Sequence, residues 1–175
     1  MSRPRRVIAA VLLVFALAFT TAAPASAFTV EQAQAFFLTQ VCAPNNAIDQ
    51  LNNAVFRGNP NFRPRKMHGK RLRQTRRALV RLARIERAVG LRLIAPPSSW
   101  PTPESAAATD ALGRAFVIDG RILNKLRARA GVRFVRYWNN VMLPHNDLLI
   151  DLEVSAGNAL GVAPDATCSP ARIFR

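Results

Sequence analysis

The sequence is poor in several residue types that mark particular classes of protein. Its 175 residues include two cysteines, eight glycines and two histidines. Two cysteines exclude a disulfide-dense mini-protein, and so few glycines exclude a collagen-like chain. No segment alternates polar and apolar residues for long enough to predict a β-strand. Half of the residues are hydrophobic, so the chain has ample apolar material for a folded core.

The short motifs of familiar enzyme classes are also missing. The sequence contains no Gly-x-Ser-x-Gly elbow, no glycine-rich phosphate loop and no Cys-x-x-Cys pair. Its histidines form no Glu-x-x-His or His-x-x-x-His pair, so we expect neither a metal nor a cofactor. No signature of specific nucleic-acid recognition is present. These absences favour a non-enzymatic protein, although a helical enzyme with an arginine-lined pocket needs no short motif.

The first 27 residues have the three-part pattern of a secretory signal peptide. Arg3, Arg5 and Arg6 precede an apolar run over residues 7–19, and Ala25-Ser26-Ala27 supplies the small residues that a signal peptidase reads. The apolar stretch ends by Pro24, short of the ~20 residues of a spanning helix, so a cleaved leader is favoured over a membrane anchor. We predict cleavage after Ala27, by Sec rather than twin-arginine export, and one secreted helical domain over residues 28–175.

An exported chain with two cysteines, Cys42 and Cys168, has one intramolecular pairing available. A disulfide between them would join the C-terminal tail to the first helix. Closing this long loop stabilises a fold by roughly 4 to 5 kcal/mol in the chain-entropy model. The alternative is two free thiols.

Capping signals and apolar spacing predict a helix at the start of the mature chain. Thr29-Val30-Glu31-Gln32 has the form of a capping box, and apolar residues recur at helical spacing to Val55. Because Pro44 falls inside this stretch, we expect one kinked helix or two collinear ones. Gly58 and Pro60 are expected to end it.

A second amphipathic helix is predicted over residues 72–93. Leucines and other apolar residues recur there at three- and four-residue spacing, and Gly90 is a candidate C-cap near the end. Four prolines in residues 95–103 then predict an extended crossover.

Two further helical stretches complete the predicted fold. One begins at Thr102, with Pro103 in its first turn, and ends at Gly131. The last covers residues 135–159, and Pro144 is expected to kink or split it. We therefore predict an all-α protein, a small four- to five-helix bundle with a kinked first and last helix and one long-range disulfide.

The positive charge of the chain is concentrated in one segment. Residues 57–92 hold 13 Lys and Arg and a single acidic residue, whereas the rest of the predicted mature chain holds nine basic and nine acidic residues. On a helical wheel, the arginines of this segment form a ridge opposite the leucine seam. The candidate anion-binding residues are Arg73, Arg76, Arg77, Arg81, Arg84 and Arg87.

Three ionisable residues fall on the apolar seams, one on each of the last three predicted helices: Glu86, Asp119 and His145. If they met in space, they would form a polar pocket between helices. The simpler interpretation is that Glu86 and Asp119 pair with arginines at the edge of the core. His145 would then bond a backbone carbonyl freed by Pro144.

The sequence is compatible with two functions. The leading hypothesis is a secreted, non-enzymatic module that binds an anionic polymer or membrane surface of the cell envelope through the arginine ridge. The alternative is a small-molecule binder or enzyme that uses the polar seam residues. An acidic protein partner is a third possibility, and the arginines are otherwise an ordinary solvated face.

Overall fold

The computed structural model of the chain describes residues 27–57 and 65–163. The predicted signal peptide therefore lies outside the described residues, except for Ala27. Cys168 also lies outside them, as do Gly58 and Pro60, the predicted end of the first helical stretch.

The protein is all-helical, as the sequence predicts. In chain order the helices are α1 (Val30–Cys42), α2 (Asn45–Phe56), α3 (Gly69–Ile94), α4 (Pro103–Arg127), α5 (Gly131–Tyr137), the π-helix η1 (Trp138–Met142) and α6 (Leu143–Ala159). The described part of the chain contains no strand, only two isolated backbone bridges. None of its helices is both long enough and apolar enough to cross a membrane.

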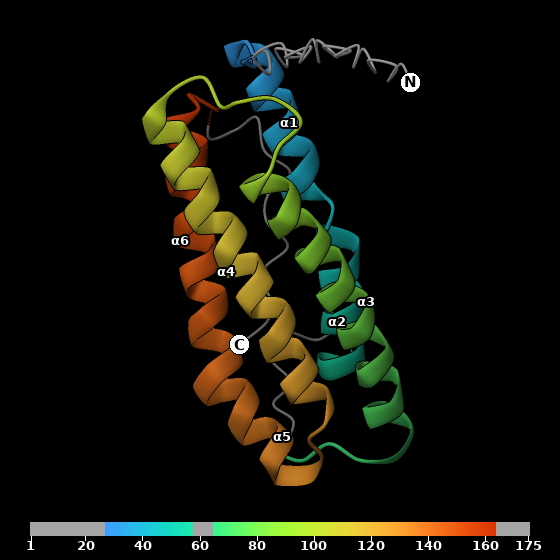
Figure 1. The fold of residues 1–175 in the computed structure, drawn as a ribbon. Helices are drawn as coiled ribbons and strands as arrows, with labels where there is room; N and C mark the ends of the chain where they lie inside the picture. Colours follow the sequence, from blue (N-terminus) through green and yellow to red (C-terminus); the bar gives the residue numbers. More distant parts are fainter. Residues whose placement is uncertain (1–26, 58–64, 164–175) are drawn as a thin grey trace, which may run out of the picture.

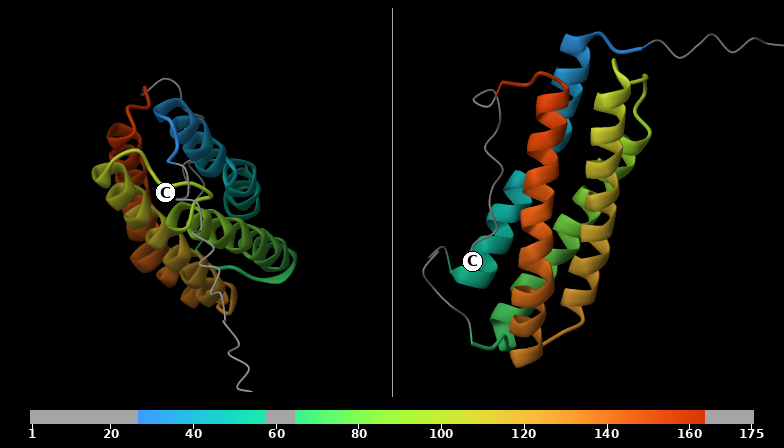
Figure 2. Two further views of the ribbon diagram at one scale, coloured as in Figure 1. Left: turned by 45° about the horizontal axis from the view of Figure 1, so that its top comes forward. Right: turned by 90° about the vertical axis from the view of Figure 1, so that its left-hand side faces the viewer.

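The helices lie side by side as a bundle of four long stretches (Figures 1 and 2). Helices α3 and α4 make the most extensive contact and form the centre of the molecule. Helices α1 and α2 pack along α3, while α6 packs along α4. The α3–α4 crossover lies at one end of the bundle. The start of α3 and the α4–α5 turn lie together at the other end (Figure 1).

The two predicted helix caps, at Thr29 and Thr102, are confirmed in atomic detail. The Thr29 hydroxyl accepts a hydrogen bond from the backbone N–H of Gln32, and the Gln32 side chain accepts one from the N–H of Thr29. Thr102 and Ser105 form the equivalent capping box at the start of α4, with Pro103 as its first residue. Pro44 separates α1 from α2, so the first stretch is two short helices.

Gly90, the candidate C-cap, does not cap its helix. Helix α3 continues to Ile94, and Gly90 lies against Gly113 of α4. A Cβ atom on Gly90 would approach the carbonyl oxygen of Gly113 to 2.5 Å, closer than real side chains come. Glycine is required here because the two helix backbones touch, not because the chain turns.

The irregularity expected at Pro144 is present, but the helix is not split. Helices α5, η1 and α6 follow one another without a gap, and the π-helical turn comes immediately before the first turn of α6. The backbone N–H of Leu143 bonds the carbonyl of Trp138, five residues earlier. This wider turn places Pro144 in the first turn of α6, where a missing N–H donor is tolerated.

The core consists of two apolar clusters stacked along the bundle. One contains Leu82 of α3, Leu123 of α4 and Met142 of η1. The other contains Val89 and Phe116, from the same two central helices, and Leu149 of α6. Glu86, Asp119 and His145 each fall between these positions on their own helix, so a polar layer lies between the two clusters.

Candidate functional site

One end of the bundle collects basic residues from two segments that are far apart in the sequence. Neither residues 57–85 nor residues 120–146 include an acidic residue. The segment before α3 pairs with the α4–α5 turn: the N–H of Gly131 donates to the carbonyl of Met67 at 2.8 Å, and the N–H of Met67 donates back at 3.3 Å. This pairing adds a second basic segment to the one that the sequence pattern singled out.

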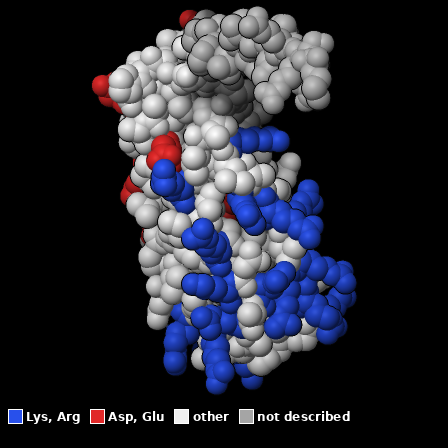
Figure 3. All heavy atoms as spheres, viewed as in Figure 1, with Lys and Arg blue, Asp and Glu red and all other residues white. Residues whose placement is uncertain are grey.

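We define the basic surface as the exposed Lys and Arg side chains of residues 65–81 and 121–136. They are Arg65, Lys66, Lys70, Arg73, Arg77, Arg81, Arg121, Lys125, Arg127, Arg133 and Arg136. Figure 3 shows basic side chains gathered over the lower half of the face in view, with acidic ones along its upper left edge. The net charge excess belongs to residues 57–92, but basic side chains of residues 121–136 join the same surface because the Met67–Gly131 pairing places the two segments together.

The six candidate ridge arginines do not have the same surroundings. Arg73, Arg77, Arg81, Arg84 and Arg87 are exposed, as the helical wheel predicts. Arg76 is half-buried and donates from Nε to the carbonyl of Arg127 at 2.9 Å and from Nη2 to that of Arg129 at 3.5 Å. It binds the carbonyl groups at the end of α4, so its role is structural.

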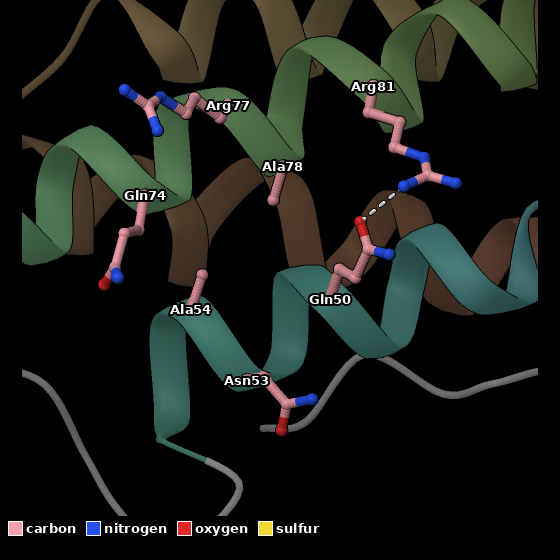
Figure 4. Close-up of a pocket in the computed structure, with 7 residues that line it drawn as sticks. All are labelled: Gln50, Asn53, Ala54, Gln74, Arg77, Ala78 and Arg81. Atoms are coloured by element: carbon pink, nitrogen blue, oxygen red, sulfur yellow. Dashed lines mark hydrogen bonds between the residues drawn. The ribbon is translucent and has the colours of Figure 1, made fainter.

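A groove of about 530 Å³ lies between α2 and α3, beside the ridge (Figure 4). The facing side chains of Ala54 and Ala78 are small, and polar side chains surround them. Arg81 reaches across the groove and donates to the side-chain oxygen of Gln50 at 2.9 Å. The residues that line the groove are Gln50, Asn53, Ala54, Gln74, Arg77, Ala78 and Arg81.

The three seam residues meet inside the bundle. Glu86 and Asp119 are only 2% and 0% exposed. The ring Nε2 of His145 lies 3.6 Å from Oδ1 of Asp119 and 3.2 Å from the carbonyl oxygen of Ala115. Because a carbonyl only accepts hydrogen bonds, Nε2 carries a hydrogen. The expected pairing of these carboxyl groups with arginines is wrong, and the carbonyl that His145 contacts belongs to α4, not to the turn before Pro144.

Burial makes both of these carboxyl groups harder to ionise. Burial, the neighbouring charge of Asp119 and a hydrogen bond to Asp119 raise the pKa of Glu86 well above its usual range. Burial also raises the pKa of Asp119, while the hydrogen bond from Glu86 and the charge of His145 act in the opposite direction. Within the described residues, neither Asp119 oxygen has an N–H or hydroxyl donor in hydrogen-bonding distance. Burial disfavours the ionised form of both carboxyl groups, most strongly for Glu86.

A third carboxyl group lies near this cluster and was missed in the sequence. Glu153 of α6 lines a cavity of about 30 Å³ together with Glu86 and Asn146. Burial raises the pKa of Glu153 to about 7. The sequence pattern could have indicated this burial, because Glu153 follows Leu149 by four residues and so lies beside the apolar seam of the helix. The cavity has room for one or two water molecules.

The remaining predicted site residues are Cys42 and Cys168. Cys42 is the last residue of α1 and is half-buried, but its predicted partner is not described, so the disulfide stays a prediction. The described residues include no group of three or more His, Cys, Asp or Glu side chains placed to hold a metal ion.

Comparisons with known proteins give no match: none of the family models fits the chain, and neither the curated proteins nor the solved structures include a significant relative.

Proposed function

We propose that this protein binds anionic polymers or anionic surfaces through the basic surface. The observation that carries the proposal is the meeting of two acid-free segments at one end of the bundle, through the Met67–Gly131 pairing. Like charges held this close repel one another, and an anionic ligand relieves the repulsion. Guanidinium groups also bind phosphate and carboxylate through paired hydrogen bonds.

The proposal predicts affinity that comes mainly from charge. Each phosphate neutralised by Lys or Arg releases counterions, so binding to duplex DNA, used as a model polyanion, weakens steeply as salt rises. Binding to anionic vesicles is expected to weaken in the same way. We expect little dependence on base sequence, because the surface carries no known base-reading motif.

The test is a salt series on the purified protein and three variants that each lose two positive charges. Arg73 and Arg77 represent the first segment, Arg133 and Arg136 represent the second, and Arg92 with Arg114 are exposed controls outside the basic surface. With each pair changed to Gln, the first two variants should reduce the salt slope by about 1 to 2 and the control should leave it nearly unchanged. Equal effects in all three variants, or no binding by the parent protein, would overturn the proposal.

The alternative, a small-molecule binder or enzyme built on Glu86, Asp119 and His145, has less support. The three side chains meet, but the cavity beside Glu86 has a volume of only about 30 Å³. Ligand sites for small molecules have volumes of about 300 to 1,000 Å³. A substrate would therefore require the helices to separate.

We also propose that the protein acts after export, with residues 1–27 removed and Cys42 paired with Cys168. Phe28 supports this starting point because it is packed into the fold: its N–H donates to the carbonyl of Ser99 at 2.9 Å, and its ring lies 5.7 Å from that of Trp100. Intact mass measurement of the secreted chain, with and without reductant, tests both points. A chain that retains residues 1–27, or that carries two free thiols, would contradict them.

A further inference from the structure

We propose that the groove between α2 and α3 is a binding site for a linear polyol phosphate, a single chain in which phosphates alternate with hydroxyl-bearing units. This inference rests on the proposed function and specifies which anionic polymer the protein prefers. The rest of the basic surface attracts anions of any shape, whereas the groove has the form and chemistry for one extended chain.

The form of the groove follows from two small residues. Ala54 of α2 and Ala78 of α3 face each other between the helices, and their short side chains leave the hollow that Figure 4 shows. Its volume of about 530 Å³ is within the range of sites that enclose small ligands. A short run of one flexible chain fits such a space, but a flat bilayer touches only its rim.

Phosphate groups are recognised by Arg77 and Arg81. These residues lie one helical turn apart on α3, about 6 Å along the axis, and both line the groove. Arg81 reaches toward α2, whereas the Arg77 side chain runs along α3 in the opposite direction (Figure 4), so the two guanidinium groups can hold separate phosphates along one extended chain. Gln50 accepts a hydrogen bond from Nη1 of Arg81 and orients that guanidinium across the groove. The remaining Arg81 donors are available for a phosphate, because guanidinium has five N–H donors. None of the described residues lining the groove is acidic.

Hydroxyl groups between the phosphates are recognised by side-chain amides. Gln50, Asn53 and Gln74 line the groove, and an amide both donates and accepts hydrogen bonds, as a hydroxyl does. Proteins that bind single-stranded nucleic acid stack its bases on aromatic side chains, and none of the described lining residues is aromatic. The lining therefore favours a polyol backbone over a nucleic acid.

The experiment compares three ligands at one moderate salt concentration: poly(glycerol phosphate), inorganic polyphosphate without hydroxyls, and anionic phospholipid vesicles. The groove variant changes Arg77 and Arg81 to Gln. Its matched control changes Arg84 and Arg87, which lie on the same helix, are also exposed and do not line the groove. A third variant, Asn53→Ala with Gln74→Ala, removes amides at constant charge. Circular dichroism verifies that each variant is folded.

We expect the groove variant to lose about tenfold or more in affinity for poly(glycerol phosphate), and the control only about two- to threefold. The amide variant should lose about threefold or more on poly(glycerol phosphate) and nothing on polyphosphate or vesicles. Equal losses in the two arginine variants, or an amide variant that binds like the parent, would overturn the groove proposal alone. A parent protein that binds none of the three ligands would overturn the proposed function as well.

Discussion

Glu86 on α3 and Asp119 on α4 are both almost fully buried, and burial together with the charge of Asp119 raises the pKa of Glu86 well above its usual range. This pair connects the two central helices in the layer between the apolar clusters. His145 brings α6 to the same layer through Asp119 and the carbonyl of Ala115. The polar layer therefore joins three helices at one level of the bundle.

Because burial raises the pKa of Glu86 well above its usual range, we expect a neutral side chain at position 86 to be tolerated in this layer. An amide can hydrogen-bond Asp119 as well, so Glu86→Gln should change the free energy of unfolding at neutral pH by less than about 1 kcal/mol. Glu86→Ala leaves Asp119 buried without its hydrogen-bond partner and should cost about 3 to 5 kcal/mol. Urea unfolding of the two variants measures the difference. If both substitutions cost the same, a neutral polar side chain at position 86 does not replace Glu86.

Stability should fall as the pH rises. The pKa of Glu153 is about 7 in the folded protein, above its ordinary value of 4.5, so the folded state binds more protons than the unfolded state between these values. The resulting stabilisation is complete below the ordinary pKa and is lost as pH rises to the folded one, by about 1 to 3 kcal/mol. The raised pKa values of Glu86 and Asp119 act in the same direction.

Thermal unfolding from pH 4 to pH 8 tests this dependence, with Glu153→Gln as the comparison. The variant should show a shallower fall in melting temperature over the same range. A parent protein whose stability rises across this interval would show that these carboxyl groups ionise more easily in the fold than in the unfolded chain.

Two buried helical glycines are expected to respond in opposite ways to a Gly→Ala substitution. A Cβ atom on Gly90 would meet the carbonyl oxygen of Gly113 at 2.5 Å, so Gly90→Ala should destabilise the protein by about 1 to 3 kcal/mol. On Gly157 of α6, the nearest atom would be 3.8 Å away. Gly157→Ala should therefore stabilise by about 0.5 to 1 kcal/mol through its better helix propensity. Chemical denaturation of both variants measures the signs, and two stabilising results would refute the close approach at Gly90.

We expect Arg76 to contribute mainly to stability and Arg73 mainly to polyanion binding, although both lie on α3. Arg76 binds the carbonyls of Arg127 and Arg129, so Arg76→Gln should lower the free energy of unfolding by about 1 to 2 kcal/mol. Arg73 is exposed, so Arg73→Gln should leave stability within about 0.5 kcal/mol while weakening polyanion binding. The two variants are compared by denaturation and by binding to duplex DNA. If Arg73→Gln proved the more destabilising, this division of roles would be wrong.

Patterns within a few residues were enough to predict the helices. The caps at Thr29 and Thr102 and the break at Pro44 depend on neighbouring residues, and the structure has all three where the sequence predicts them. The exposed ridge arginines follow equally from the helical period. The role of Gly90 could not be predicted in this way, because glycine is common both at helix ends and at close contacts between helices. Only the position of α4 distinguishes the two roles.

The relations between helices required the tertiary structure. Glu86, Asp119 and His145 could be placed on seams, but their shared level depends on how far each helix slides along its neighbour, which packing such as the Gly90–Gly113 contact sets. The pairing of Met67 with Gly131 likewise joins two basic segments that no local pattern connects. Local helix formation depends on short-range sterics and hydrogen bonds, whereas these sites depend on contacts between residues distant in the chain.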